Sequence, residues 1–289
     1  MPLQFEPIHP VFAAEANAID LQDVHDPATL ASIRQALDQY AVIVFRDQKM
    51  SNEAHIAFTQ RLDGTLHTQT SLSVLSKNRF GNEALTDVGN VDEKGELMAA
   101  DDRRRMGNVS NRLWHTDASF VNPPGRYSLL LGKVVPPVRA DTEFVDMRAA
   151  YDTLEPALRD SLEGLDVHHS IVYSRQLLGF EFTQAEQDRL KGAVHPLVRT
   201  VQSSGRRALY LASHASRVVD WPLPEGRLLL RDLMEHATRE SVIYRHIWRP
   251  DDLLIWDNRA TMHRGRPFAD RAHRREMHRT TTLDIPQSA

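Results

Sequence analysis

Three residues able to ligate a metal ion stand out in this chain: His115, Asp117 and His263. The first two form its single His-x-Asp tripeptide, inside the run LWHTDASF over residues 113–120. Side chains two residues apart lie on the same face of an extended segment, so both can reach one ion. Two imidazoles and a carboxylate on one face of an octahedron leave three positions open, as in non-haem Fe(II) oxygenases. His263 must come from another strand.

Several arginines follow the distant histidine. Arg274 and Arg275 follow His263 at about the sequence distance that a chain needs to turn back into the next strand. Arg279 comes four residues after Arg275, so their side chains would lie on the same face of that strand. A guanidinium matches a carboxylate bidentately, so one arginine could hold the distal carboxylate of a keto-acid cosubstrate. Arg279 could hold a second anion, that of the substrate.

The same residues leave two other classes of protein open. Two histidines and one carboxylate also suit zinc, which would make the chain a zinc hydrolase. A jelly-roll protein that binds organic acids without catalysis is the other alternative. The arginine pair and the open face of the metal argue against the hydrolase, and the intact triad argues against the binding protein.

Composition excludes several other functions. Lys+Arg 35 against Asp+Glu 39 gives a net charge of −4, which disfavours nucleic acid or an acidic membrane as partner. No stretch reaches the ~20 apolar residues that a membrane helix needs, and no signal peptide is visible. The chain has no cysteine, which excludes disulfides, thiolate nucleophiles and Cys-ligated metals. We therefore expect a cytoplasmic protein that binds a small molecule.

The elements that position these residues are mainly strands with helical insertions. Apolar periodicity predicts helices over residues 27–40, 51–61 and 224–238, the first capped by Asp26. Strands are predicted over 41–45, 127–135, 142–146, 167–173, 253–256, 261–263 and 277–283. No linker divides residues 1–289, so we expect one domain, a β-sandwich or jelly roll. The polar stretch around 64–106 is long enough to predict an active-site lid loop.

Five segments together resemble the taurine dioxygenase/TfdA family of Fe(II)- and 2-oxoglutarate-dependent dioxygenases. The resemblance spans nearly the whole chain and is strongest to the 2,4-dichlorophenoxyacetate dioxygenase branch, through the runs at 141–152, 195–200 and 214–216. It implies a double-stranded β-helix (jelly roll) fold. The segments are WHTD at 114–117, DTEF at 141–144, WDNR at 256–259, MHR at 262–264 and RREMHR at 274–279.

The resemblance also implies roles for single residues. His115, Asp117 and His263 would ligate Fe(II). Arg275 and Thr142 would bind the distal carboxylate of 2-oxoglutarate, with Trp256 packed beside it. Arg279 would pair with the acidic group of the substrate, and His214 would line the substrate pocket or lie near it.

The reaction implied by the branch is hydroxylation of the carbon next to the ether oxygen of an aryloxyacetate. The products would be a phenol, glyoxylate, succinate and CO2, with Fe(II), 2-oxoglutarate and O2 required. The substrate would be a small anionic aromatic acid of the herbicide type, degraded by a homo-oligomeric enzyme. The alternative within the family is a dioxygenase for taurine, another alkylsulfonate or a sulfate ester.

The chain departs from its relatives at three places. Arg139-Ala140 stands where they usually have two glycines, and Leu62-Asp63-Gly64-Thr65 replaces a Phe-Gly-Pro run. Arg217 stands where the branch has a second histidine. The last two differences fall where we expect substrate contacts.

Overall fold

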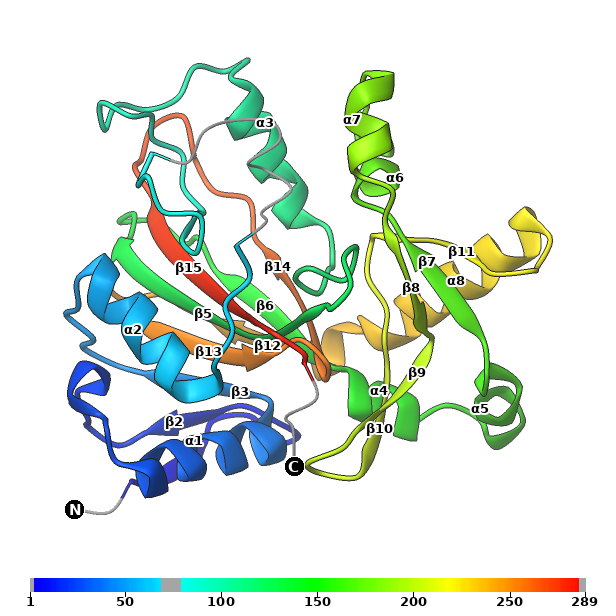
Figure 1. Cartoon of the computed structure of the whole chain (residues 1–289), viewed down its shortest axis with the longest axis horizontal. Coiled ribbons are helices and arrows are strands. Elements are labelled where there is room, and N and C mark those ends of the chain that lie inside the picture. The colour runs from blue at the N-terminus through cyan, green and yellow to red at the C-terminus, as the bar shows by residue number, and fades with distance from the viewer. Residues whose placement is uncertain (1–2, 69–78, 286–289) are drawn as a thin grey trace.

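Two sheets face each other in the computed structural model, which describes residues 3–68 and 79–285 (Figure 1). The larger has seven strands, which pair antiparallel except at one parallel pair, the second and third. Their order is β1 (Phe5–Pro7), β2 (Ala14–Ala16), β3 (Val42–Phe45), β13 (Leu253–Asp257), β5 (Gly125–Val134), β15 (Glu276–Leu283) and β4 (Thr86–Asp87). The smaller has the order β12 (Tyr244–His246), β6 (Thr142–Asp146) and β14 (Thr261–Gly265).

One apolar core fills the space between these sheets. Leu130 of β5, Trp256 of β13 and Met277 of β15 project from the larger sheet into it. Phe144 of β6 and Tyr244 of β12 meet them from the smaller sheet. Because strand side chains alternate between faces, Leu254 and Trp256 of β13 point into this core, two residues apart. The predicted combination of sheets and helices is therefore present, with slightly more residues in helices than in strands.

The other face of the larger sheet is covered by two helices, α1 (Pro27–Tyr40) and α2 (Asn52–Asp63). Leu129 and Leu131 alternate with Leu130 along β5 and pack on this helical side. The predicted helix over 27–40 is confirmed, and its cap is the predicted one. The Asp26 carboxylate accepts the N–H groups of Ala28 and Thr29, which would otherwise lack partners at the helix start.

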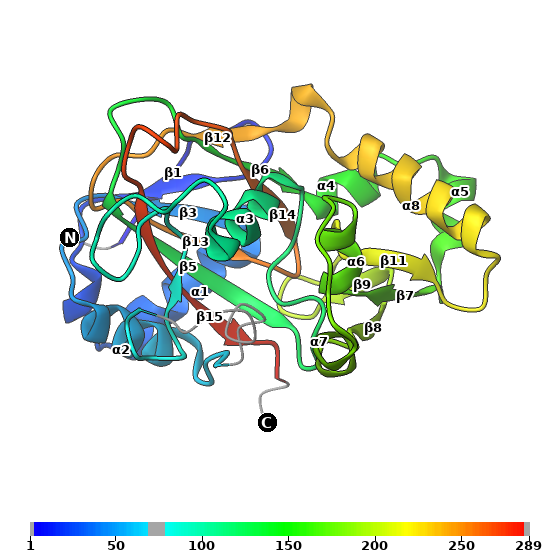
Figure 2. The ribbon, with the colours of Figure 1, turned by 90° about the horizontal axis from the view of Figure 1, so that it is seen from above.

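Residues 147–243, which lie between β6 and β12 in the sequence, form a second group of elements (Figure 1). Figure 2 shows this group from above. Leu230 and Leu233 join them to Val145 of β6 through a shared apolar cluster. The strands are β7 (Asp166–His169), β8 (Ala193–Pro196), β9 (Val198–Val201), β10 (Arg206–Leu209) and β11 (Ala215–Val218). The helices are α4 (Met147–Asp152), α5 (Pro156–Leu162), α6 (Ile171–Gln176), α7 (Gln184–Arg189) and α8 (Leu223–Ala237).

The predicted strand over residues 167–173 is wrong in its second half. The strand β7 ends at His169, and α6 begins two residues later. Ser170 causes the change, because its side chain accepts the N–H of Tyr173 and so caps a helix. The apolar and β-branched residues of this run could not distinguish a buried strand from a short buried helix.

The stretch predicted as a loop around 64–106 is not wholly irregular. Its described part contains the short strand β4 and the start of α3 (Arg103–Val109), which Asp102 caps through the N–H groups of Arg104 and Arg105. Residues 69–78 of the predicted lid lie outside the described residues. Among the residues that are described, no helix combines the length and apolar character needed to cross a bilayer.

Replacing His55 with Gln should make folding less sensitive to acid. His55 is 0% exposed on α2, and burial lowers its pKa to about 3. The unfolded chain takes up a proton there below pH ~6.5, but the folded chain does not until much lower pH. This contribution to stability is therefore intact above pH ~6.5 and is lost as the pH falls toward 3. Between pH 7 and 5 the wild type should lose about 2 kcal/mol more than the variant.

Denaturant unfolding at the two pH values measures this difference. The matched control is His25→Gln, because His25 is exposed. Equal acid sensitivity of the His55→Gln protein and the wild type would contradict the prediction.

Candidate active site

The strand β14 brings His263 beside the segment that carries His115 and Asp117. The N–H of His115 donates to the carbonyl of His263 at 3.0 Å, and the N–H of His263 donates back at 2.8 Å. This antiparallel bridge joins two segments far apart in the sequence. All three residues are buried, and their ligand atoms lie within 4.8 Å of one another. The predicted triad is thus one cluster.

The donor atoms of this triad converge. The Nε2 atoms of His115 and His263 lie 3.8 Å from Oδ1 and Oδ2 of Asp117, respectively. Nδ1 of His115 lies 2.8 Å from the carbonyl of Leu113, so this nitrogen carries the proton and Nε2 keeps its lone pair. Two imidazole nitrogens and one carboxylate, with no thiolate, fit Fe(II).

The electrostatic environment keeps these residues in their metal-binding forms. Burial lowers the pKa of His115 and holds that of His263 well below its ordinary value. Burial alone would raise the pKa of Asp117, but the positive charge of Arg279 and the hydrogen bond from Ser128 hold it below its ordinary value. Neutral imidazoles and an ionised carboxylate are the forms that a metal requires.

Asn258 supports the triad from behind. Its Oδ1 accepts the N–H of Asp117 at 3.0 Å and the indole N–H of Trp256 at 3.0 Å. Its Nδ2 donates to Ser128 Oγ at 2.9 Å, and Ser128 donates in turn to Asp117 Oδ2 at 2.7 Å. The Thr116 hydroxyl donates to the Asn258 carbonyl at 2.7 Å. One buried amide therefore orients both the backbone and the carboxylate of Asp117.

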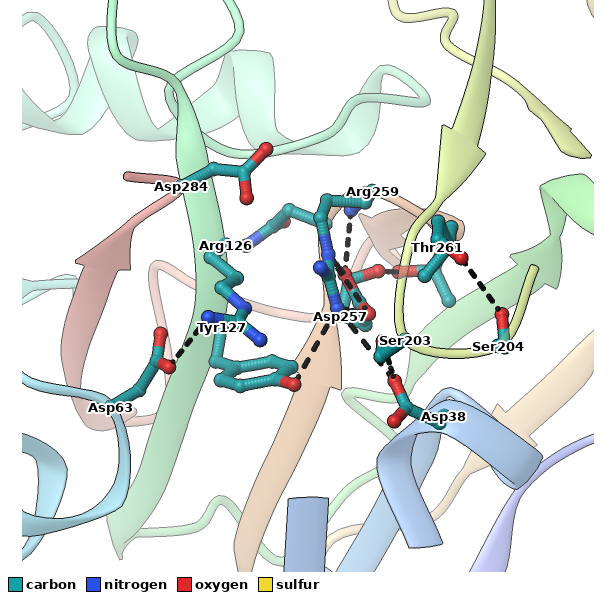
Figure 3. A network of polar contacts seen from close by, with 12 residues as sticks. Asp38, Asp63, Arg126, Tyr127, Ser203, Ser204, Asp257, Arg259, Thr261 and Asp284 are labelled. Atoms are coloured by element: carbon teal, nitrogen blue, oxygen red, sulfur yellow. Dashed lines mark hydrogen bonds and ion pairs between the residues drawn. The ribbon is translucent and has the colours of Figure 1, made fainter. Parts of the chain in front are cut away.

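The turn that presents Asn258 is held by its two neighbours (Figure 3). Asp257 accepts Nε of Arg259 at 2.9 Å and Nη2 at 2.7 Å, and also the Arg259 backbone N–H at 2.8 Å. Arg259 reaches the Tyr127 hydroxyl at 3.5 Å and lies 3.8 Å from Asp38. The sequence run Trp-Asp-Asn-Arg is therefore a rigid support for the triad.

Changing Asn258 to Ala should weaken Fe(II) binding about 10- to 100-fold, the effect typical of removing a hydrogen-bonded support from a metal ligand. The variant loses the amide that orients Asp117 but keeps all three ligands. A titration with Fe(II) under nitrogen measures the change. Ser203→Ala is the matched control, because Ser203 bonds Asp38 at the outer end of the same network and does not touch the triad. Unchanged affinity in Asn258→Ala would show that Asp117 is held without it.

A pocket lies against the two histidines. Five arginines line it, and in the described residues four of them are paired with carboxylates. Arg105 and Arg112 pair with Asp270, Arg266 with Glu143, and Arg279 with Asp117. Arg275 has no ion pair or side-chain hydrogen bond in the described part of the chain, and burial lowers its pKa to about 10. An unpaired guanidinium in such a pocket is poised for an anion.

Thr142 and Trp256 line the pocket that contains Arg275, as predicted. The indole N–H of Trp248 donates to Thr142 Oγ1 at 2.9 Å. This bond occupies an acceptor position of the hydroxyl and leaves its own proton for a ligand. Trp256 also packs against His263, with ring centroids 4.6 Å apart. Thr142 and Arg275 can therefore act on the same carboxylate.

Arg279 and His214 lie at different distances from this pocket. Arg279 lines it, and Nη1 donates to Asp117 Oδ1. His214 is not among the pocket residues; it is buried beside His115, with ring centroids 6.2 Å apart. Its Nδ1 lies 3.1 Å from Ser119 Oγ, and its ring meets Phe120 edge-on at 4.9 Å. His214 therefore lies near this pocket but does not line it.

Asn90 is a site residue that the sequence did not single out. Its Oδ1 accepts the N–H of Arg275 at 2.8 Å, and its Nδ2 donates to the carbonyls of Asp270 and His273. At Gly89, the residue before it, a Cβ atom would lie 2.8 Å from the Arg275 carbonyl. The Gly-Asn pair in the polar stretch was the available signal, since glycine permits such a close approach.

The departures from the relatives lie outside the triad. Ala140 lines the pocket, while Arg139 beside it is largely exposed and pairs with Asp141. Asp63 accepts hydrogen bonds from Arg126 at 2.9 Å (Figure 3) and from Thr282 at 2.8 Å, and it is not among the residues that line the pocket. Arg217 is exposed on β11. The prediction that Asp63 and Arg217 fall at substrate contacts thus gains no support from their positions.

Comparison with known proteins extends the likeness to the whole chain. A family model described as "Taurine catabolism dioxygenase TauD, TfdA family" matches residues 4–281. The chain is 43% identical over 279 residues to the alpha-ketoglutarate-dependent 2,4-dichlorophenoxyacetate dioxygenase of Cupriavidus pinatubonensis, covering 96% of each protein. It is 40% identical over 284 residues to the protein of the same name from Burkholderia sp. (strain RASC), covering 98% of this chain and 95% of the relative.

A solved structure is also similar over its full length. The crystal structure of AAD-2 in complex with Mn(II) and N-oxalylglycine matches with a TM-score of 0.90 and 37% identity, covering 100% of both chains. Its Mn(II) shows that a similar fold holds a divalent metal.

Proposed function

Because the chain belongs to the Taurine catabolism dioxygenase TauD, TfdA family, we propose that it hydroxylates the carbon next to the ether oxygen of an aryloxyacetate. The reaction consumes 2-oxoglutarate and O2 and yields a phenol, glyoxylate, succinate and CO2. The observation that carries this proposal is the convergence of His115, Asp117 and His263 beside the unpaired Arg275. Similarity to two 2,4-dichlorophenoxyacetate dioxygenases over at least 96% of this chain supports the choice of substrate.

Different residues of the chain bind the metal, the cosubstrate and the substrate. His115, Asp117 and His263 hold Fe(II), which with 2-oxoglutarate and O2 supplies the oxidising power when bound. Arg275 and the Thr142 hydroxyl bind the distal carboxylate of the cosubstrate, which fixes its other end at the triad. Arg279 binds the carboxylate of the substrate, and His214 lies beside its ring.

Apolar side chains keep water from the reacting atoms. Leu130, Trp256 and Phe268 line the pocket next to the triad. Val88 and Val109, one from within the stretch around 64–106 and one just after it, close the pocket from another side. Excluding water strengthens the ion pairs that hold the two acids and protects reactive species from side reactions.

We extend the proposal to the architecture. The two facing sheets are the halves of a double-stranded β-helix, residues 1–289 act as one domain, and the described part of the stretch around 64–106 covers the cosubstrate. A homo-oligomeric state and a cytoplasmic location stay predictions, which sedimentation and cell fractionation test.

The experiment compares two classes of anionic substrate. The protein is supplied with Fe(II), 2-oxoglutarate and O2, and then with 2,4-dichlorophenoxyacetate or taurine. We expect phenol and succinate in equal amounts from the first and no substrate-dependent succinate from the second. Sulfite release from taurine without phenol from the aryloxyacetate would favour the alternative. Absence of 2-oxoglutarate-dependent O2 uptake would favour a zinc hydrolase.

A further inference from the structure

Asn90 joins two separate parts of the chain at the edge of the pocket. Its Oδ1 accepts the N–H of Arg275 at 2.8 Å, and its Nδ2 donates to the carbonyls of Asp270 at 2.6 Å and His273 at 2.8 Å. Its backbone N–H donates to the Arg275 carbonyl at 3.2 Å. Asn90 is 6% exposed and lines the pocket. One residue therefore holds both backbone groups of Arg275 and the loop that leads to it.

The place of the Arg275 guanidinium depends on this backbone contact. In the described part of the chain, no ion pair or side-chain hydrogen bond fixes the guanidinium itself. It lies at the end of a long side chain, so a small rotation of the backbone moves it further than the backbone moves. A misplacement of ~1 Å at a binding group can cost about 100-fold in rate. The contact with Asn90 therefore controls how well Arg275 meets an anion in the pocket.

The same contact leaves the charge of Arg275 free. Asn90 is neutral, so it holds the Arg275 backbone without pairing with the guanidinium. The loop over residues 266–275 contains one acidic residue, Asp270, which also lines the pocket. Asn90 holds the carbonyl of Asp270, while the carboxylate accepts Nη2 of Arg105 at 2.9 Å. The loop therefore brings Arg275 to the pocket with its charge available and keeps its own carboxylate on another arginine.

Gly89 permits the close approach of Asn90 to this loop. A Cβ atom at Gly89 would lie 2.8 Å from the Arg275 carbonyl and 3.5 Å from the Cα of Glu276. The first of these distances is too short for a real contact, so a larger residue at position 89 would require the Arg275 backbone to shift. The backbone of Arg275 is thus located by the pair Gly89-Asn90, which belongs to a distant part of the sequence.

We infer that Asn90 is a positioning residue for 2-oxoglutarate, acting through Arg275. The inference rests on the proposed function and adds a residue that sets the affinity for the cosubstrate. Asn90 holds the Arg275 backbone so that the guanidinium meets the distal carboxylate, and as a neutral amide it leaves the charge of Arg275 for that carboxylate. Among the described residues, no hydrogen bond or ion pair joins the Asn90 side chain to the metal-binding triad.

The test measures KM for 2-oxoglutarate in the Asn90→Ala protein. We expect KM to rise about 10- to 100-fold, the effect of misplacing a binding group. The value of kcat at saturating 2-oxoglutarate and the affinity for Fe(II) should stay as in the wild type, whereas a general loosening of the site would lower both. Gly89→Ala is the second variant if Asn90→Ala does not fold. It keeps the Asn90 side chain but displaces the Arg275 carbonyl, so KM for 2-oxoglutarate should rise there too.

A double-mutant cycle shows whether Asn90 acts through Arg275. In the Arg275→Gln protein no guanidinium is left to position, so adding Asn90→Ala should change KM for 2-oxoglutarate little, whereas independent effects would multiply. Asn17→Ala is the matched control, because Asn17 also accepts a backbone N–H, that of Gln4 at 2.9 Å, and does not line this pocket. We expect its KM to equal that of the wild type.

The outcomes separate this inference from the proposed function. An unchanged KM for 2-oxoglutarate in the folded Asn90 or Gly89 variant, or effects that multiply in the cycle, would overturn the role of Asn90. With an active wild type, either result leaves the proposed function standing. A wild type that forms no succinate from 2-oxoglutarate would overturn both.

Discussion

The His263→Ala protein should bind no stoichiometric Fe(II) and form succinate at least ~10³-fold more slowly than the wild type. The variant keeps His115 and Asp117, but two ligands on adjacent positions cannot hold the ion against water and buffer. The Asp117 carboxylate would still pair with Arg279, so the rest of the site stays neutralised. Anaerobic Fe(II) titration and succinate release measure the two effects separately.

His263 is a better position for this test than Asp117. Replacing Asp117 would also leave Arg279 without its ion pair, so loss of metal and disruption by an unpaired cation could not be separated. The control is His273→Ala, because in the described part of the chain no hydrogen bond, ion pair or ring contact joins the His273 side chain to the triad. The imidazole of His263 packs on Trp256, so Tm is measured beside activity. Full turnover by His263→Ala would refute the metal site.

The Arg275→Gln protein should require about 100-fold more 2-oxoglutarate for half-maximal turnover. The guanidinium is the unpaired cation of the pocket among the described residues, so its loss removes the charge that attracts the distal carboxylate. A charge-assisted bond of ~3 kcal/mol corresponds to about this factor. Steady-state KM for 2-oxoglutarate at saturating Fe(II) is the measurement, with KM for the aryloxyacetate followed in parallel.

Arg266→Gln is the matched control for this variant. Arg266 lines the same pocket, but its side chain is 45% exposed and lies 3.6 Å from the Glu143 carboxylate, so solvent and this carboxylate screen its charge. We expect less than a ~3-fold change in KM for 2-oxoglutarate in this control, since surface ion pairs contribute ~1 kcal/mol or less. Equal effects in the two variants would mean that total positive charge, and not the unpaired Arg275, attracts the cosubstrate.

Local patterns in the sequence predicted much of the site. The two-residue spacing of His115 and Asp117 is enough to predict that both ligands lie on one face of an extended segment. Asp26 before a periodic run predicts α1 to the residue, because helix capping depends on neighbours three residues away or fewer. The roles of Arg275 and Thr142 came from the resemblance, since no spacing rule relates positions so far apart.

The polar network could not be predicted in this way. Asn258 is one of many asparagines in the sequence. Only the folded structure brings its side chain to the backbone N–H of Asp117, next to the bridge between the His115 segment and β14. Likewise, a strand was predicted after residue 170 but the chain forms α6 there, because a single serine hydroxyl caps the helix. Apolar periodicity cannot detect such a cap.

By itself the sequence determined which atoms could ligate a metal, that they are nitrogen and oxygen and not sulfur, and that the chain combines sheets with helices. These are properties of residue type and short spacing. Only the tertiary structure decided which of the pocket arginines lie beside a carboxylate and which does not, so that Arg275 differs from Arg266 among the described residues. The physical reason is that ion pairing acts over a few ångströms in space, between residues that the fold brings together from distant parts of the chain.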